Sequence, residues 1–339
     1  MGEQYTGSGE RYRSDSYKAL QYRRRRRKKY LKRLKAAVMV LCLVAAAVVY
    51  GVRGGYLGQQ SPGPQDSGGE AGLQTMEVHF LDVGQGDATL VKCGGQALLI
   101  DTAEEDMGTA IQYYLQQQGV KRLEYLLLTH PDADHIGSAD VILTKFDVGQ
   151  VLMTDYEKDN STYRQLIRTL EYRRITPRLI CAGDGSVSDD TLSPGDSFPL
   201  GDAVCTILAP VAEYEDPNNS SIFLLIEHGA NRFLFTGDGQ ETAEEDVAEY
   251  WEALGISLDA DVYKAGHHGS STSSGEKLLS AVQPDFAVIS CGEGNDYGHP
   301  HAETMEIFKE RGIKVYRTDR QGYIVAVSDG QEIVWQTAR

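Results

Sequence analysis

The stretch Thr129-His-Pro-Asp-Ala-Asp-His135 decides how the fold is interpreted, because it places four metal-ligand side chains within six residues. It directly follows the apolar run Leu123 to Leu128, which predicts a strand that ends in a polar turn before a helix. Sites in α/β folds usually lie at such strand ends. The spacing lets the side chains converge on two divalent ions. The alternative is a capped helix start, which needs one Asp and no histidine.

Two later strand ends carry the same kind of residue. One apolar run leads into Thr236-Gly-Asp238, and another leads into Lys264-Ala-Gly-His-His-Gly269, where glycines let the backbone approach a ligand. A carboxylate such as Asp238 can bridge two ions about 3.5 to 4 Å apart, although it could also be a turn residue or a helix cap. By contrast, His79 within a strand and His228 at a strand end are more typical of structural histidines.

Short β-like runs alternate with helical stretches from Met76 onward. Several neighbouring runs are joined by turns too short for a crossover helix, so we expect mixed sheets. Lys314 to Arg317 and Tyr323 to Ser328 form a closing pair of runs. Two βα-rich halves, divided near residues 184–199, predict an α/β (α+β) fold with two sheets packed face to face and helices outside.

The N-terminus differs sharply from the remainder in charge. Residues 1–35 contain 13 Lys/Arg and three acidic residues, giving +10, and the other 304 residues contain 20 Lys/Arg and 46 Asp/Glu, giving −26. The uncharged segment 36–52 is at the short end of what spans a bilayer. We expect residues 1–35 to be a basic cytoplasmic tail and 36–52 an uncleaved transmembrane signal anchor, with everything after Arg53 exported. A cleaved signal peptide and a buried core helix are the competing interpretations.

The segment after the anchor separates it from the folded part. Residues 53–75 are rich in Gly, Pro, Ser and Gln and predict a flexible linker, which leaves 76–339 as one large domain. The basic run Arg23 to Lys29 could contact nucleic acid, but beside an apolar span its simpler role is orientation and anionic-lipid contact. The five cysteines show no C-x-x-C spacing, so no zinc knuckle or redox motif is predicted.

Seven motifs in order resemble the metallo-β-lactamase superfamily, and more closely its branch with the exported domain of ComEC-type competence proteins. The motifs are Phe80-Leu-Asp-Val-Gly-Gln-Gly-Asp-Ala88, Leu99-Ile-Asp101-Thr, Thr129-His-Pro-Asp-Ala-Asp-His-Ile-Gly137, Asn218-Asn-Ser-Ser221, Thr236-Gly-Asp238, Lys264-Ala-Gly-His-His-Gly-Ser270 and His299-Pro300. The resemblance implies an αββα four-layer sandwich, with the metal site at the sheet edges.

The resemblance also implies two metal positions that share one carboxylate. The complete position consists of Asp134, His135, His267 and the bridging Asp238. The other would use His130, Asp132 and Asp238, with Asp132 where the superfamily usually has a histidine. The usual third histidine is missing there, and Asn218 or Ser221 stands in its place. We therefore expect one or two divalent ions, Zn²⁺ or Mn²⁺, with the second site weaker and harder.

The reaction implied is hydrolysis of a phosphodiester by a metal-bound hydroxide, which Asp134 or Asp132 would orient. His299 would contact the phosphate or protonate the leaving oxygen, and Asp101 would support a ligand imidazole. The residues expected to support ligands or bind phosphate are His268 and Lys264. The loop residues expected to face the cleft, or alternatively to cap turns, are Asp82, Gln85 and Asp87.

These expectations combine into a membrane-anchored, single-pass, outward-facing hydrolase, most simply a nuclease or phosphodiesterase acting on DNA. Strong nonspecific DNA binding normally needs a basic surface. The part of the chain after residue 35 has a net charge of −26, so it would need a local Lys/Arg patch or bound cations to bind DNA. One alternative substrate is another envelope ester, such as a phosphocholine or teichoic-acid phosphodiester or a lactone. A further alternative is a non-catalytic module that binds DNA or a partner. With one expected span, any role in DNA uptake would need a separate membrane channel protein.

Overall fold

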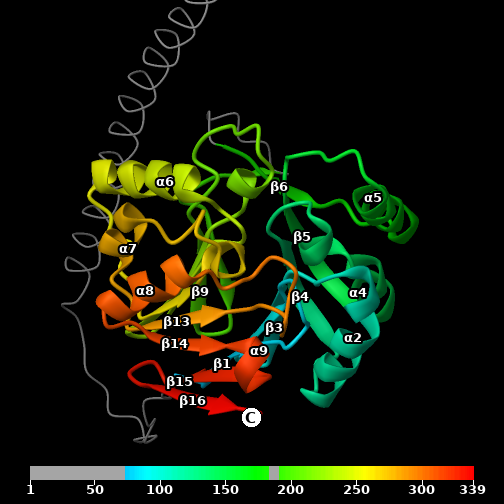
Figure 1. Cartoon of the computed structure of the whole chain (residues 1–339). Helices are drawn as coiled ribbons and strands as arrows, with labels where there is room; N and C mark the ends of the chain where they lie inside the picture. Colours follow the sequence, from blue (N-terminus) through cyan, green and yellow to red (C-terminus); the bar gives the residue numbers. More distant parts are fainter. Residues whose placement is uncertain (1–72, 183–190) are drawn as a thin grey trace, which may run out of the picture. The chain divides into compact units, whose positions relative to one another are not determined.

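The computed structural model describes residues 73–182 and 191–339, and these form two mixed β-sheets with flanking helices (Figure 1). The first sheet has the strand order β16-β15-β1-β2-β3-β4-β5-β6-β7. Its strands are β1 (Met76–Phe80), β2 (Thr89–Cys93), β3 (Gln96–Ile100), β4 (Arg122–Leu128), β5 (Asp147–Thr154), β6 (Arg178–Ile180), β7 (Thr191–Leu192), β15 (Ile324–Ser328) and β16 (Ile333–Thr337).

The second sheet has the order β14-β13-β12-β11-β10-β9-β8. Its strands are β8 (Ser197–Leu200), β9 (Ala203–Ile207), β10 (Leu224–His228), β11 (Asn231–Phe235), β12 (Val262–Lys264), β13 (Phe286–Ile289) and β14 (Lys314–Arg317). The helices are α2 (Gly108–Gln117), α3 (Ala133–Ile136), α4 (Ala139–Lys145), α5 (Ser161–Arg173), α6 (Glu241–Leu254), α7 (Glu276–Val282), α8 (Ala302–Glu310) and α9 (Thr318–Gln321), with 3-10 turns η1 (Glu105–Met107), η2 (Asn218–Ser220) and η3 (Gly266–Gly269).

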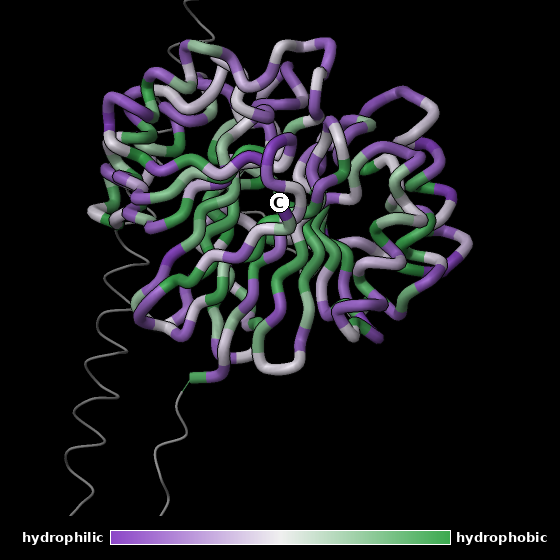
Figure 2. The backbone as a smooth tube through the Cα atoms, turned by 60° about the horizontal axis from the view of Figure 1, so that its bottom comes forward, coloured by the Kyte–Doolittle hydropathy of each residue, from purple (hydrophilic) through white to green (hydrophobic). Residues whose placement is uncertain are grey.

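Three apolar layers show how these elements stack. A central layer takes buried side chains from both sheets, and within it Phe80 of β1 lies against Phe235 of β11, with ring centroids 6.2 Å apart. A second layer joins the first sheet to α2, α4 and α5, and a third joins the second sheet to α6, α7 and α8. The apolar strands run through the middle of the domain, with more polar chain outside (Figure 2). This order of layers is the one expected for an αββα sandwich.

Parallel strands place their carboxyl ends at a common sheet edge. In the first sheet β3, β4, β5 and β6 are parallel neighbours, and in the second β11, β12, β13 and β14 are parallel neighbours. Near-continuous apolar runs such as Leu126–Leu128 suit strands that are buried on both faces. The loops after β4, β11 and β12 carry the predicted ligand motifs, so the topology brings these motifs toward one place.

Most strands and helices coincide with the predicted runs, including the closing two. These two runs enter different sheets: β14 lies parallel to β13 in the second sheet, whereas β15 lies antiparallel to β1 in the first, with Phe80 opposite Ile324. Between them α9 and Gly322, at φ 67°, redirect the chain from one sheet to the other. The edge strand β16 was not predicted, because its partly exposed residues show no clear alternation.

The basic tail and the signal anchor, with all but the end of the predicted linker, fall on residues 1–72, outside the described residues. Within residues 73–182 and 191–339, no helix combines the length and apolar character needed to cross a bilayer. Both assignments therefore stay predictions from the sequence.

Candidate metal centre

The loop after β4 is held tightly by its neighbours. The backbone N–H of Asp87 donates to the carbonyl of Asp134 at 3.1 Å, and that of Thr102 donates to the carbonyl of His135 at 2.6 Å. Gly86 lies at φ 140°, and a Cβ atom built on it would come within 2.6 Å of the Asp134 carbonyl oxygen. Only glycine permits this close approach. The motif 80–88 thus serves as a support on which the loop rests.

Four side chains gather where the two sheets meet this loop. One ligand atom from each lies within 4.8 Å of the others, and the four residues are Asp134, His135, Asp238 and His268. His135 Nε2 lies 3.2 Å from Asp238 Oδ1, and His268 Nε2 lies 3.1 Å from Asp134 Oδ2 and 3.6 Å from Asp238 Oδ2. Three of the four are fully buried, and Asp134 is partly exposed. Its carboxylate therefore faces the opening of the site.

Unsatisfied buried atoms show that these residues fit a divalent ion. His130 Nε2, His135 Nε2 and Asp238 Oδ1 are buried and have no hydrogen-bond partner among the described residues. Leaving such polar atoms unpaired costs roughly 1–3 kcal/mol each, so they need a partner of another kind. Imidazole nitrogens and carboxylate oxygens together suit ions such as Zn²⁺ or Mn²⁺. The donor set and its orphaned atoms thus match a metal centre.

The ligands are oriented by residues behind them. His135 Nδ1 lies 2.8 Å from Asp101 Oδ2, and Asp101 in turn accepts hydrogen bonds from the backbone N–H and the hydroxyl of Thr129 at 2.8 and 2.7 Å. His268 Nδ1 donates to the Ser290 carbonyl at 3.0 Å. In both histidines Nδ1 is engaged, so Nε2 points to the centre, where a bound ion would replace its proton. The prediction that Asp101 supports a ligand imidazole agrees with this geometry.

The electrostatics of the centre attract positive charge. Burial lowers the pKa of His135, but Asp238 and Asp101 outweigh burial and raise it well above the ordinary value. Burial raises the pKa of Asp238 and Asp134, but the facing imidazoles dominate and lower both. Burial, aided by His135, lowers the pKa of His130 to about 4, so this imidazole is neutral at pH 7. A neutral imidazole is the form that binds metal.

Two predicted ligands are placed differently from the expectation. His267 does not join the four-residue group, and His268 takes its place. Both histidines have positive φ, 49° and 54°, within the turn η3, and their Nδ1 atoms have different partners, the Thr272 hydroxyl and the Ser290 carbonyl. The His267 side chain is 24% exposed, its Nε2 lies 3.9 Å from Asp238 Oδ2, and its Nδ1 lies 3.0 Å from the Thr272 hydroxyl.

Asp132 is the second predicted ligand that lies outside the four-residue group. It occupies the N-cap position of α3 without a side-chain capping hydrogen bond, and it pairs with Lys158, whose Nζ lies 2.6 Å from Asp132 Oδ1. The remaining residues of the second predicted position are His130, whose Nε2 lies 3.9 Å from Asp238 Oδ2, and Asp238 itself. At the place where the superfamily usually has a third histidine, Ser221 accepts the backbone N–H of Asp238 at 3.1 Å, and Asn218 begins η2. Any second ion would have few protein ligands.

His299 lies beside the centre, as predicted, in a loop held by other polar groups. Gln85 Nε2 lies 3.4 Å from His299 Nδ1, and Asn295 binds both the N–H and the carbonyl of His299, at 2.9 and 2.7 Å. Burial, together with His268 and His267, lowers the pKa of His299 to about 4. The exposed ring of Tyr297 stacks on His299, with centroids 5.6 Å apart.

Of the other residues predicted to support the centre, some lie beside it and one lies away from it. Lys264 is almost fully buried, and its Nζ lies 2.9 Å from Asp87 Oδ2. Burial raises the pKa of Asp87, but Lys264, His268 and His135 together outweigh burial, so the pKa falls below its ordinary value. Asp82 lies away from the group, where it accepts from Arg339 at 3.0 Å. As predicted, His79 and His228 are structural: they bind Tyr114 at 2.9 Å and Ser328 at 2.7 Å.

The sequence of this chain is similar to those of several known proteins. The model of the metallo-beta-lactamase superfamily matches residues 81–293, more than half of the chain. The chain belongs to the metallo-beta-lactamase superfamily. Within it, the chain is 31% identical over 269 residues to ComE operon protein 3 of Bacillus subtilis, covering 73% of this chain and 32% of that protein. The family resemblance stated from the motifs is thereby confirmed.

Two further superfamily relatives support the same branch. Recombination protein 2 of Haemophilus influenzae is 32% identical over 240 residues, covering 68% of this chain and 26% of the relative. Competence protein ComA of Neisseria gonorrhoeae is 31% identical over 246 residues, covering 72% of this chain and 31% of that protein. The chain thus matches about a third of the length of these relatives. It carries the superfamily fold and a His/Asp cluster suited to metal, and it is related to competence proteins.

Several residues at the centre were missed by sequence reasoning. Thr129 holds Asp101, Lys158 engages Asp132, and Asn295 fixes the His299 loop. Thr129 directly precedes the ligand stretch, so its position was a usable signal. Lys158 and Asn295 stand in polar loops with no pattern of their own, and only the folded chain shows where they lie.

Proposed function

We propose that this chain is a metal-dependent hydrolase of phosphodiesters that acts on DNA. The observation that carries the proposal is the buried group of Asp134, His135, Asp238 and His268, with orphaned atoms at His135 Nε2 and Asp238 Oδ1. The relation to competence proteins directs the choice of substrate toward DNA. A divalent ion held there would lower the pKa of a water and neutralise charge on the phosphate.

The chain's own residues have separable tasks in such a reaction. Asp134, the partly exposed member of the group, is placed to accept a proton from the attacking water. His299 Nδ1 faces the Gln85 amide, so its Nε2 carries the proton and can donate to a phosphate oxygen. The low pKa of His299, about 4, favours this hydrogen bond over protonation of the leaving oxygen.

The proposed setting follows from the sequence outside the described residues. The basic tail 1–35 and the apolar segment 36–52 support a single-pass anchor with the hydrolase domain outside the cell membrane. The membrane is thus one proposed partner. A separate membrane channel protein is another, needed only if the chain acts in DNA uptake.

The full chain, purified in detergent, tests the proposal. We expect it to hydrolyse single-stranded DNA after loading with Mn²⁺ or Zn²⁺, and Asp134→Ala and Asp238→Asn to abolish the activity. Asp82→Asn is the matched control, because Asp82 lies on the 80–88 motif but binds Arg339 outside the group. Equal activity in wild type and Asp134→Ala would exclude this site as the source of hydrolysis.

The acidic surface favours one alternative, hydrolysis of another envelope ester. Residues 76–339 contain 19 Lys/Arg and 44 Asp/Glu, a net charge of −25 that opposes polyanion binding at long range. A teichoic-acid phosphodiester or a lactone would be the substrate in that case. One metal-loaded preparation can be assayed for hydrolysis of DNA, of glycerol-phosphate polymer and of lactones. The substrate that is hydrolysed fastest distinguishes the candidate functions.

A further inference from the structure

Positive charge in the domain is unevenly distributed, and the largest group lies in one segment. Six of the 19 Lys/Arg of residues 76–339 lie within residues 158–178, which contain only two acidic residues. We call residues 158–178 the basic segment. Its charge is +4, whereas the rest of 76–339 has 13 Lys/Arg and 42 Asp/Glu, a charge of −29. The basic segment, which contains α5, is therefore one part of the domain surface that can attract a polyanion. Residues 309–320 also carry five Lys/Arg and two acidic residues, but three of these cations, Lys309, Arg311 and Arg317, are paired with carboxylates.

A depression of about 620 Å³ runs along α5 between this helix and α4. Arg164, Arg168 and Tyr172 line it at intervals of four residues, which places them one above the other on a single helix face. Asp140 of α4 also lines it, and this carboxylate keeps its negative charge: Oδ2 accepts a hydrogen bond from Gln165 at 2.7 Å, and Oδ1 is buried without a hydrogen-bond partner among the described residues. We call this depression the α5 trough.

The side chains of the α5 trough are available for a ligand. Arg168 is exposed and forms no ion pair or hydrogen bond with the part of the chain that the structure describes. Arg164 is exposed and pairs only with Asp159, which is itself 93% exposed. Tyr172 is 84% exposed. Ion pairs between exposed side chains contribute little, about 0–1 kcal/mol, so a phosphate can replace Asp159 easily.

The trough is connected to the metal centre through the start of α5. Asn160 caps the helix by accepting the backbone N–H of Tyr163 at 2.7 Å. Tyr163 and Leu166 lie beside His130 and Pro131, around a gap too small to admit water. Lys158, two residues before the cap, pairs with Asp132 at 2.6 Å. A strand bound along α5 would therefore approach the ligand loop at the helix N-terminus.

We infer that the α5 trough binds single-stranded nucleic acid and guides it to the metal centre. This inference rests on the proposed function and names the surface that holds the substrate. Arginines supply phosphate contacts, and an exposed aromatic ring supplies a stacking surface that every base can use. A teichoic acid carries phosphates without bases, so Tyr172 would contribute nothing to its binding. The combination of arginine and tyrosine therefore favours nucleic acid.

Binding is measured separately from cleavage, with the full chain in detergent and a single-stranded oligonucleotide of about 20 nucleotides. We expect Arg164→Gln/Arg168→Gln to weaken binding on the order of tenfold at low salt, and to reduce the salt slope by about 1.4, the amount for two phosphates. Hydrolysis of bis-p-nitrophenyl phosphate, too short to reach the trough, should stay unchanged. Tyr172→Ala should weaken binding of the oligonucleotide but not of an abasic strand of equal length.

The matched control is Lys277→Gln/Lys309→Gln, which removes two surface cations from α7 and α8. Because every variant keeps residues 1–35, the basic tail contributes equally throughout. The α5 trough is rejected if the arginine variant binds DNA as the control does. It is also rejected if the arginine substitutions weaken binding of glycerol-phosphate polymer or of phosphatidylglycerol vesicles more than they weaken binding of DNA. A wild-type chain that binds DNA through the trough but cleaves no phosphodiester would refute the proposed function instead.

Discussion

His268 Nε2 lies 3.1 Å from Asp134 Oδ2, and the Nδ1 atom of the same ring is held by the Ser290 carbonyl. The adjacent His267 is partly exposed and turned toward Thr272. The structure thus distinguishes two neighbouring histidines that the motif alone presents as equivalent. The assignment of the histidine ligand in this loop can be tested directly.

We expect His268→Ala to weaken binding of Zn²⁺ or Mn²⁺ by more than the roughly 10- to 100-fold that loss of a supporting residue costs. His267→Ala should change the affinity by less than about tenfold, since its Nε2 stays 3.9 Å from Asp238. Metal content after dialysis and competition with a chelating dye give the measurement. The opposite ranking of the two variants would restore His267 as the ligand.

A second prediction concerns the buried pair of Lys264 and Asp87. Lys264→Met leaves the Asp87 carboxylate buried without its cation, so unfolding should become easier by about 3–5 kcal/mol. The double variant Lys264→Met/Asp87→Asn should recover much of that loss, because no uncompensated charge remains. Denaturant unfolding with EDTA present keeps metal binding out of the comparison. If the double variant is no more stable than the single one, charge compensation is not the role of Lys264.

A third prediction concerns Tyr297, whose ring is 68% exposed and stacks on His299. Its position at the opening offers a second surface on which a base can stack, a contact worth about 1–3 kcal/mol. Tyr297→Leu should therefore raise KM for single-stranded DNA by about tenfold while leaving an abasic strand unaffected. Tyr297→Trp should keep the wild-type value. An equal effect on both substrates would show that the ring only supports His299.

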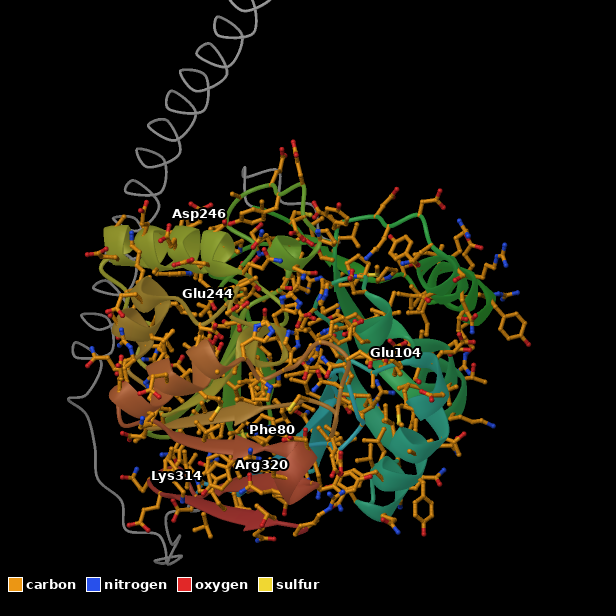
Figure 3. The ribbon with its side chains drawn as sticks, in the orientation of Figure 1. Phe80, Glu104, Glu244, Asp246, Lys314 and Arg320 are labelled. Atoms are coloured by element: carbon orange, nitrogen blue, oxygen red, sulfur yellow. The ribbon has the colours of Figure 1, made fainter. Side chains whose placement is uncertain are left out.

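A fourth prediction concerns pH and Glu244, which lies on the inner side of α6 (Figure 3). Burial raises the pKa of Glu244 to about 7, although Ser274, Gly275 and Tyr263 donate hydrogen bonds to it. A raised carboxyl pKa means that the folded chain favours the protonated form. The stabilisation is therefore complete below the ordinary value of 4.5 and is lost as the pH rises through about 7.

Glu244→Gln removes this titration, and its own effect on the free energy of unfolding does not vary with pH. Relative to the variant, the wild type should lose about 2–3 kcal/mol of unfolding free energy between roughly pH 5 and pH 8. Denaturant unfolding at both pH values, with a chelator present, provides the measurement. A difference between wild type and variant that does not change with pH would contradict the raised pKa.

Much of the fold could be predicted because its signals are local. Long apolar runs such as Leu123 to Leu128 identify buried strands, and each ligand motif directly follows such a run. The topology then brings the motifs together, since parallel strands end at one edge. The gathering of Asp134, His135 and Asp238 follows from these two facts.

The remaining details depend on contacts that no local pattern reveals. Asp132 is diverted by Lys158, 26 residues further along the chain. The choice between His267 and His268 depends on two positive φ angles in one turn. Strands β14 and β15 are near neighbours in the chain, yet β14 pairs with β13 of the second sheet and β15 with β1 of the first. In each case a distant neighbour or a backbone angle decides where the residue lies.

The ligands of the metal centre come from both sheets of the sandwich. His135 follows β4 of the first sheet, whereas Asp238 and His268 follow β11 and β12 of the second. A bound ion would therefore be a cross-link between the two halves of the domain, added after the apolar layer has formed. Divalent metal in the surroundings would then govern how long the chain survives proteases, and a metal-starved cell would lose the protein as well as its activity.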